Sequence, residues 1–321
     1  SQSIEGVGSY FAYIKLSEVQ QKQGNLLKAL DSSFSALEIN KNFPPALSQY
    51  FFILKSAGIN ENDINENLKK SYPIFDVKGL EILVGVLYAH RNKLLQYYID
   101  EYNIEVNNSV LAISALYNKK YEEASLIWEK ENILDNNIFS DVFTLLMVQE
   151  NEELLRKLLQ SMNLNKKEKV ELTSIVNKSD NKLISFSETI YDMIKNACIN
   201  LLRVDEESVF LETYRKLNLN VQQKEQLISS LINNGYLKIA IDLLTDELNT
   251  NSKNYELIGL LADGYSRQNR FKEALDLYTQ LIEKVGSYSS YNRLYNLYQK
   301  INYSDGLPLI ETQMKIILEN E

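Results

Sequence analysis

Reactive side chains are scarce in this 321-residue chain, which contains one cysteine, Cys198, and one histidine, His90. A single cysteine cannot form a disulfide within the chain, so the sequence does not resemble a disulfide-stapled secreted domain. The apolar residues around Cys198 predict a buried thiol rather than a reactive one. A zinc-protease motif needs two histidines on one helix face, and a Ser–His–Asp arrangement would depend on His90, which we expect at a helix end.

Motifs that bind cofactors and phosphates are also absent. No G-x-x-x-x-G-K-[ST] loop occurs, and Gly6 and Gly8 lack the third glycine and the preceding strand of a dinucleotide-binding motif. No D-x-D sequence occurs, although many sugar-transferring enzymes hold a metal and a nucleotide with one. We therefore expect no cofactor, no metal ion and no enzymatic activity in this chain.

No stretch of the sequence has the length of a membrane span. The most apolar segment, 80–89, is about half of the ~20 residues that a span needs. The first residues contain neither the basic region nor the apolar region of a signal peptide. These absences predict a cytoplasmic protein without a membrane span.

The charge balance is acidic. Lys and Arg number 34 against 43 Asp and Glu, which gives a net charge of −9 and a pI near 5.0. Binding to nucleic acid requires basic side chains that neutralise phosphates, so we expect no nucleic-acid partner. Acidic clusters at 150–153 and 205–207 are expected at helix starts, where carboxylates interact favourably with the helix dipole.

Few helix-breaking residues interrupt the apolar residues, which make up 45% of the chain. Only four prolines and eleven glycines occur, and this composition favours a helical protein. A pattern of paired helices is clearest near 255–283, where two apolar stripes at i, i+3, i+4 and i+7 flank the short break "RQNR". The first stripe consists of Ile258, Leu261, Ala262 and Tyr265. The second consists of Phe271, Ala274, Leu275, Tyr278, Leu281 and Ile282.

A small residue recurs inside the second stripe of successive helix pairs. Ala274 lies 34 residues after Ala240, and Gly235 supplies the turn of the earlier pair. Two antiparallel helices approach closely only where a side chain is small. The interval therefore predicts helical hairpins stacked on one another.

This pattern resembles the tetratricopeptide repeat (TPR), whose period is about 34 residues. The best copy matches the family at Ile258, Leu261, Ala262, Tyr265, Ala274, Tyr278, Leu281 and Ile282. A copy near the start matches at Tyr13, Leu16, Ser17, Gly24, Leu26, Ala29, Ala36 and Leu37. A third copy matches at Leu111, Ala112, Ala115, Tyr121, Ala124 and Trp128. The chain departs from the family where Ile258 replaces an aromatic residue, where Gln20 replaces an apolar one, and in lacking a closing proline.

The resemblance implies an all-α fold, a right-handed α-solenoid of TPR-like hairpins with degenerate central repeats. We expect an N-terminal array over 1–176, an irregular helical connector over 177–220, and a C-terminal array with a capping helix over 221–321. Gly306 and Pro308 stand near the small-residue position of the last unit, as suits an atypical end repeat.

Binding residues are predicted on the first helices of the hairpins, which line the concave side of such a solenoid. The predicted partner contacts there are Glu225, Ser229, Asp263 and Arg267. Gln222, Asn233, Glu256 and Gly259 share these faces, and the mixture is polar and slightly acidic. TPR modules that clamp a C-terminal carboxylate use a set of Lys, Asn and Arg that these faces lack, so we do not expect a chaperone-tail receptor.

A tyrosine series is the most distinctive surface candidate. Tyr288, Tyr291, Tyr295 and Tyr298 follow the i, i+3, i+7, i+10 spacing of one helix face. One interpretation packs these rings against the capping helix with their hydroxyls at the rim. The other is an aromatic ledge for a peptide, a sugar chain or another helix, since tyrosine offers contact area at little entropic cost.

The sequence therefore predicts a scaffold that binds a protein or peptide in a concave groove and does no chemistry. The openings "YFAYIKLSEVQQKQGNLLKALDSSFSALEIN" and "FPPAL" also resemble the start of the TPR array that follows the catalytic domain in bacterial family 2 glycosyltransferases. An accessory region excised from such an enzyme is the alternative, and the missing initiator methionine fits it. A peptide-sensing transcriptional regulator is a third reading, and the oligomeric state stays open.

Overall fold

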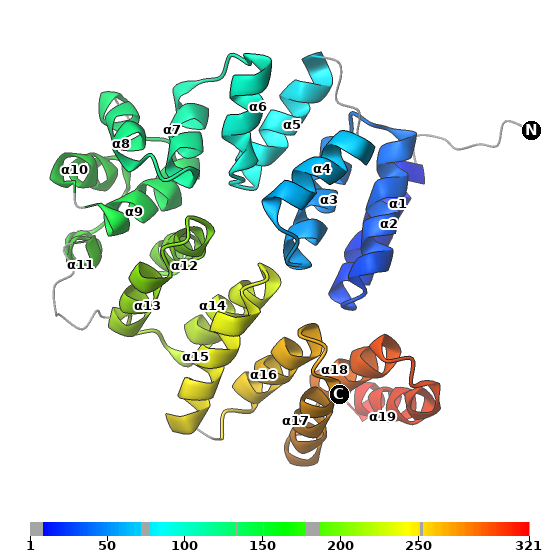
Figure 1. Ribbon diagram of the computed structural model, residues 1–321. Helices are drawn as coiled ribbons and strands as arrows, with labels where there is room; N and C mark the ends of the chain where they lie inside the picture. The colour runs from blue at the N-terminus through cyan, green and yellow to red at the C-terminus, as the bar shows by residue number, and fades with distance from the viewer. Residues whose placement is uncertain are drawn as a thin grey trace, which may run out of the picture. The chain divides into compact units, whose positions relative to one another are not determined.

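The computed structural model describes residues 9–71, 77–131, 134–149, 151–176, 187–250 and 253–320. Every regular element in these ranges is a helix and none is a strand (Figure 1). The all-helical class predicted from the sequence is confirmed. No helix within the described ranges is both long and apolar enough to cross a membrane.

The chain divides into two compact units. Unit 1 comprises Ser1–Ile59 and Lys224–Glu321, and unit 2 comprises Asn60–Gln223. Unit 1 contains α1 (Ser9–Lys22), α2 (Leu26–Ile39), α3 (Pro44–Ser56), nearly all of α14 (Val221–Asn233), α15 (Leu237–Thr250), α16 (Tyr255–Arg267), α17 (Phe271–Lys284), α18 (Tyr288–Lys300), the 3-10 turn η2 (Ser304–Gly306) and α19 (Leu307–Asn320). Unit 2 contains α4 (Glu61–Ser71), α5 (Val77–Ala89), α6 (Leu94–Tyr102), α7 (Asn108–Tyr117), α8 (Tyr121–Lys130), η1 (Asn136–Ile138), α9 (Phe139–Val148), α10 (Glu152–Ser161), α11 (Lys166–Val176), α12 (Glu188–Arg203) and α13 (Glu207–Lys216).

The three-part division expected from the sequence was drawn from how closely each segment matches the repeat pattern, whereas the two units are defined by contacts between residues. The three-part division stays a prediction. Part of its connector, 177–186, lies outside the described residues. The remainder of the connector includes α12 and α13, two helices that contact each other.

Left-handed residues recur in the turns that separate paired helices. Two sets are evenly spaced, at positions 24, 58 and 91, after α1, α3 and α5, and at positions 235, 269 and 302, after α14, α16 and α18, whereas those at 103, 119, 205 and 286 fall outside this spacing. Each set has intervals of 34 and 33 residues. A residue with positive φ lets the chain leave one helix and reverse within a few residues. The same turn geometry thus returns at the same interval in two separate parts of the sequence.

Helices pack with their sequence neighbours and with the next helix but one. In unit 1, α1 contacts both α2 and α3, and α16 contacts both α17 and α18. In unit 2, α5 contacts α6 and α7, and α7 contacts α8 and α9. The first helix of a pair therefore packs on its partner and on the first helix of the following pair. The order changes at α9, which packs against α12 as well as α10 and α11.

Small residues are buried between packed helices. Ala240 and Ala274 are fully buried, as is Ala124 in unit 2. At Gly264 a Cβ atom would stand 3.1 Å from Cγ1 of Ile241, so α16 and α15 come close at this glycine. These positions match the packing role predicted for the recurring alanine.

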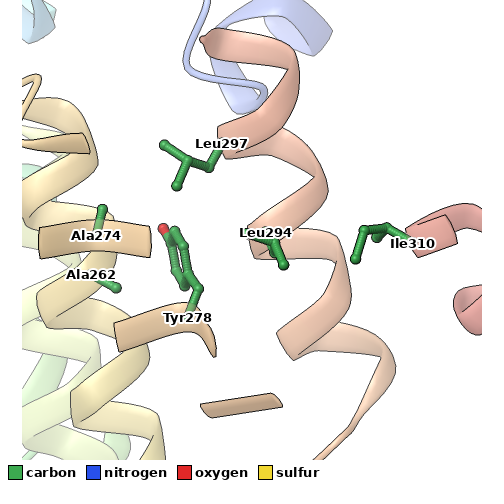
Figure 2. Close-up of a cluster of buried hydrophobic side chains, with 6 residues drawn as sticks. All are labelled: Ala262, Ala274, Tyr278, Leu294, Leu297 and Ile310. Carbon is green, nitrogen blue, oxygen red and sulfur yellow. The ribbon is translucent and has the colours of Figure 1, made fainter. Parts of the chain in front are cut away.

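The end of unit 1 is closed by a hydrophobic cluster. Its buried members are Ala262, Ala274, Tyr278, Leu294, Leu297 and Ile310. Figure 2 shows the residues of α16 and α17 on one side of α18 and Ile310 of α19 on the other. Gly306 is needed beside this cluster, since a Cβ atom there would lie 2.4 Å from Cε2 of Tyr298. The small residue predicted for the capping unit therefore makes room for an aromatic ring.

Two smaller sequence predictions concern unit 2. Glu152 and Glu153 lie in the first turn of α10, which Asn151 caps by accepting a hydrogen bond from the backbone N–H of Leu154 (2.9 Å). Glu207 begins α13. Cys198 is fully buried in α12, and burial raises the pKa of its thiol to about 12. The predicted helix-start and buried-thiol assignments are confirmed.

Candidate functional site

A polar pocket of about 180 Å³ lies in unit 1 on the first helices of the C-terminal pairs. Helices α14, α16 and α18 supply most of its walls, and the turn at 22–24 also lines it. Three of the residues predicted to contact a partner line this pocket, namely Ser229, Asp263 and Arg267. The fourth, Glu225, lies on α14 one turn before Ser229 and is not among the lining residues.

Asp263 is the pocket's one carboxylate among the described residues that line it. Its Oδ1 atom accepts a hydrogen bond from the Tyr278 hydroxyl (2.5 Å), and its Oδ2 atom lies 3.6 Å from Nε of Arg293. Desolvation raises the pKa of the Asp263 carboxyl, and the charge of Arg293 and the Tyr278 hydrogen bond oppose this rise. Its side chain remains 29% exposed, so the carboxylate faces the pocket with part of its acceptor capacity unused.

Arg293 lies across Gly259. A Cβ atom at Gly259 would stand 1.5 Å from Nη1 of Arg293, so the guanidinium lies directly over this glycine and would have to move if a side chain were present. Arg293 also lies 3.5 Å from the exposed Glu256 and is itself 19% exposed. Gly259 was predicted to share the binding face, and its structural contribution is to admit an arginine from the next helix pair.

Arg267 and Lys300 are the other two cations contributed by the C-terminal pairs. Arg267 donates hydrogen bonds to the backbone oxygen of Ile232 (3.2 Å) and to Oδ1 of Asn233 (2.8 Å). Lys300 donates to the backbone oxygen of Ser266 (2.6 Å). In the described part of the chain, neither cation has a carboxylate oxygen within 4.0 Å. Lys300 also lies over the Phe271 ring, 5.3 Å from its centroid, so the direct contacts of both cations are with neutral groups.

The electrostatic environment of these two cations is unfavourable. Desolvation lowers the pKa of Arg267, although the charge of Asp263 opposes the shift. Desolvation also lowers the pKa of Lys300, and the positive charge of Arg267 lowers it further. Two like charges thus share a partly buried site in a protein whose net charge is −9.

The pocket differs from the slightly acidic lining predicted from α14 and α16. Helix α18 adds Arg293, Asn296 and Lys300, which sequence reasoning missed. The repeat interval held a signal for Arg293 alone, which stands 34 residues after Gly259 of the predicted face; Asn296 and Lys300 correspond to Ala262 and Ser266, which were not assigned to that face. Carrying the predicted faces forward by one repeat would have placed all three helices around one site.

Glu225 is half-buried near the same helices. Desolvation raises the pKa of its carboxyl, and the neighbouring charge of Glu256 raises it further. Its partner-binding role stays a prediction.

The tyrosine series divides between surface and interior. Tyr288 is 37% exposed, whereas Tyr291, Tyr295 and Tyr298 are partly buried and pack against the hydrophobic cluster. The Tyr295 hydroxyl donates to Oε1 of Glu311 on α19 (2.9 Å). The Tyr298 ring packs edge-on against Tyr303 at a centroid distance of 4.9 Å. Tyr295 thus links α18 to α19, Tyr298 packs on the turn between them, and a docking role for the series stays a prediction.

Unit 2 contains a second buried charge cluster, centred on Asp141 of α9. The Asp141 side chain is fully buried. Arg91 donates from Nη2 to Oδ2 (2.8 Å) and from Nε to both carboxylate oxygens (3.1 Å). The Tyr117 hydroxyl (2.9 Å) and Nδ2 of Asn200 (3.2 Å) donate to Oδ1. These hydrogen bonds engage both oxygens of the buried carboxylate.

Groups suited to metal binding do not occur in the described ranges, where no three His, Cys, Asp or Glu side chains converge. His90 lies in the turn that follows α5. No protein-family model matches the chain, and the search of curated proteins finds no match either. The argument for function therefore depends on the chain's own repeats and on the pocket.

Proposed function

We propose that this protein is a TPR-like helical-repeat scaffold that binds a segment of a protein or peptide partner and performs no chemistry of its own. Two features of the fold support the repeat assignment. Left-handed turn residues return at intervals of 34 and 33 residues in two parts of the chain. First helices pack on first helices of the next pair, as stacked hairpins of a solenoid do.

The observation that carries the binding role is the pocket built by α14, α16 and α18. Successive first helices deliver Ser229, Asp263 and Arg267 to one site, and they were predicted as partner contacts from their helix faces alone. In a solenoid these faces form the continuous surface on which partners bind. A volume of about 180 Å³ corresponds to roughly six water molecules at ~30 Å³ each. The pocket is therefore suited to one polar side chain of a partner whose backbone crosses the surrounding helices.

Selection from a random peptide library displayed on phage tests this proposal, with the whole chain as bait. We expect selected peptides, resynthesised and labelled, to bind the chain with measurable fluorescence anisotropy. Ser229→Trp fills the pocket and should abolish that binding. Gln280→Trp is the matched control, because Gln280 is exposed on α17 and does not line the pocket.

Equal loss of binding in both tryptophan variants, or no loss in either, contradicts a partner site at this pocket. Circular-dichroism melts of both variants separate loss of binding from loss of fold. A library that returns no binding peptide after selection on the folded chain, both as translated and after kinase phosphorylation of its serines, contradicts the peptide-binding function itself.

A further inference from the structure

The pocket in unit 1 holds more positive charge than its protein partners neutralise. Arg293 lies 3.6 Å from a carboxylate oxygen of Asp263 and 3.5 Å from one of Glu256. In the described ranges, Arg267 and Lys300 have no carboxylate oxygen within 4.0 Å and donate to neutral oxygens instead. Taking cations partly out of water is unfavourable unless an opposite charge completes the site. Mutual repulsion between Arg267 and Lys300 adds to this cost. The arrangement therefore favours binding of an anionic group.

The chemistry of the donors narrows the class of anion. Arg267 and Arg293 carry planar forks that match the oxygens of a phosphate or a carboxylate, and Lys300 contributes a compact ammonium group. Asn296 adds an amide donor to the lining. A pocket of about 180 Å³ holds one small, multiply charged group more readily than two separate carboxylates.

Asp263 favours an anion that carries a proton over one that is fully ionised. A carboxylate that faces a bound anion repels it unless the anion carries a proton that the carboxylate can accept. A phosphate monoester has a second pKa near 6 and therefore exists partly as a protonated monoanion near neutral pH. Sulfate and simple carboxylates are fully ionised at that pH and offer no such donor.

We propose that this pocket binds a phosphate monoester group carried by the partner, with Arg267, Arg293 and Lys300 as the cations that hold its oxygens and Asp263 as the acceptor for its proton. The inference rests on the proposed function, because the phosphate belongs to the bound protein or peptide. The inference adds that the partner group bound in this pocket is a phosphate monoester.

The test uses the whole chain and the probe N-acetyl-O-phosphoserine N-methylamide, measured by isothermal titration calorimetry at pH 6.5 and fixed ionic strength. The comparison ligands are the unphosphorylated amide, inorganic phosphate, sulfate and succinate. We expect the phosphoserine amide to bind at least about tenfold more tightly than every one of them. Arg267→Gln and Lys300→Gln should each weaken it by about tenfold or more, since each removes a charge-assisted hydrogen bond. The control Lys238→Gln removes an exposed lysine on α15 outside the pocket and should change binding by less than about twofold.

Asp263→Asn separates the preference for a protonated anion from a structural effect. Asparagine keeps an oxygen for the Tyr278 hydroxyl but carries no charge. We expect this variant to bind sulfate nearly as tightly as the phosphoserine amide, whereas a merely structural residue would weaken both ligands together.

Several outcomes would overturn the proposal. Sulfate binding as tight as that of the phosphoserine amide to the unmodified chain indicates charge attraction without selection. Tighter binding of succinate indicates a carboxylate site, and equal binding of inorganic phosphate indicates a site for the free ion. Failure of every phosphate probe while display-selected peptides still bind overturns this inference and leaves the proposed function intact. Phosphoserine binding with no peptide selected, from the library as translated or after kinase phosphorylation of its serines, overturns the proposed function instead.

Discussion

Each unit of this protein places an arginine beside a buried or half-buried aspartate, and the two pairs are completed differently. In unit 2, Asp141 receives Arg91 at 2.8 Å and further hydrogen bonds from Tyr117 and Asn200. In unit 1, Arg293 stays 3.6 Å from Asp263, and three further cations, Lys22, Arg267 and Lys300, line the same pocket. A buried charge with all its partners has no capacity left for a ligand, whereas an excess of one sign beside a cavity does. The contrast separates a structural charge cluster from a binding site.

The largest effect is expected where the completed cluster is broken. Asp141→Asn keeps the shape of the side chain but leaves the guanidinium of Arg91 without its counter-charge. Removing one partner of a buried ion pair costs about 3–5 kcal/mol of unfolding free energy. Asp263→Asn should cost less than ~1 kcal/mol, because the 3.6 Å pair is looser and its carboxylate is partly exposed. Urea unfolding followed by circular dichroism measures both.

A surface pair in unit 2 provides the reference for this prediction. Glu153 and Arg156 form an ion pair on α10 with side chains 49% and 64% exposed. Glu153→Gln should change the unfolding free energy by less than ~1 kcal/mol. Similar losses in the Asp141 and Asp263 variants would erase the distinction between the two clusters.

A smaller loss of stability is expected when the buried alanines are enlarged. These variants test whether the helical hairpins pack in the same way in both units. Ala274→Leu in unit 1 and Ala124→Leu in unit 2 insert bulk at fully buried positions. Overpacking a tight core typically costs about 1–3 kcal/mol. We expect both variants to lose stability within that range in urea unfolding, while Ala12→Leu on the exposed face of α1 stays within about 0.5 kcal/mol of the parent. Loss at Ala274 alone would restrict the hairpin packing to unit 1.

Much of the fold could be predicted from the sequence because paired helices and the turns between them produce recognisable patterns over short stretches of sequence. Apolar stripes with the helical period located α16 and α17, and Gly235 was expected to end a helix in the left-handed conformation that it adopts at φ 86°. Each of these features depends on residues close together in the chain.

The binding site could be predicted only in part, because its geometry depends on the register between helix pairs. The helix faces identified Ser229, Asp263 and Arg267. On α18 the sequence predicted a binding role only for the tyrosines, so Arg293 and Lys300 on the same helix were missed. The pair of Arg91 and Asp141 was missed altogether. These residues are 50 positions apart, and no local pattern marks an aspartate in an apolar helix as one half of an ion pair.

The smallest effect is expected in how the stability of the protein changes with pH through Lys300. It tests whether Lys300 lacks a counter-charge, in contrast to Arg91 beside Asp141. Desolvation lowers the pKa of Lys300 in the folded protein below its ordinary value of 10.5. Between these two values the unfolded chain binds more protons than the folded one, so stability rises with pH in that window. The stability of the unmodified protein relative to Lys300→Gln should therefore increase as the pH approaches 10.5, by less than ~1 kcal/mol because the side chain is only half-buried.

Thermal melts at several pH values between 8 and 10.5 measure this difference, with Lys238→Gln on the exposed face of α15 as the correction for removing any lysine. Subtracting the two variants cancels the titration of other lysines and of tyrosines, which changes in the same way in both. A relative stability that falls as the pH rises would mean that the Lys300 ammonium group is stabilised by a negative charge in the folded protein. In that case the pocket already holds its counter-charge, and the difference between the two clusters disappears without any ligand.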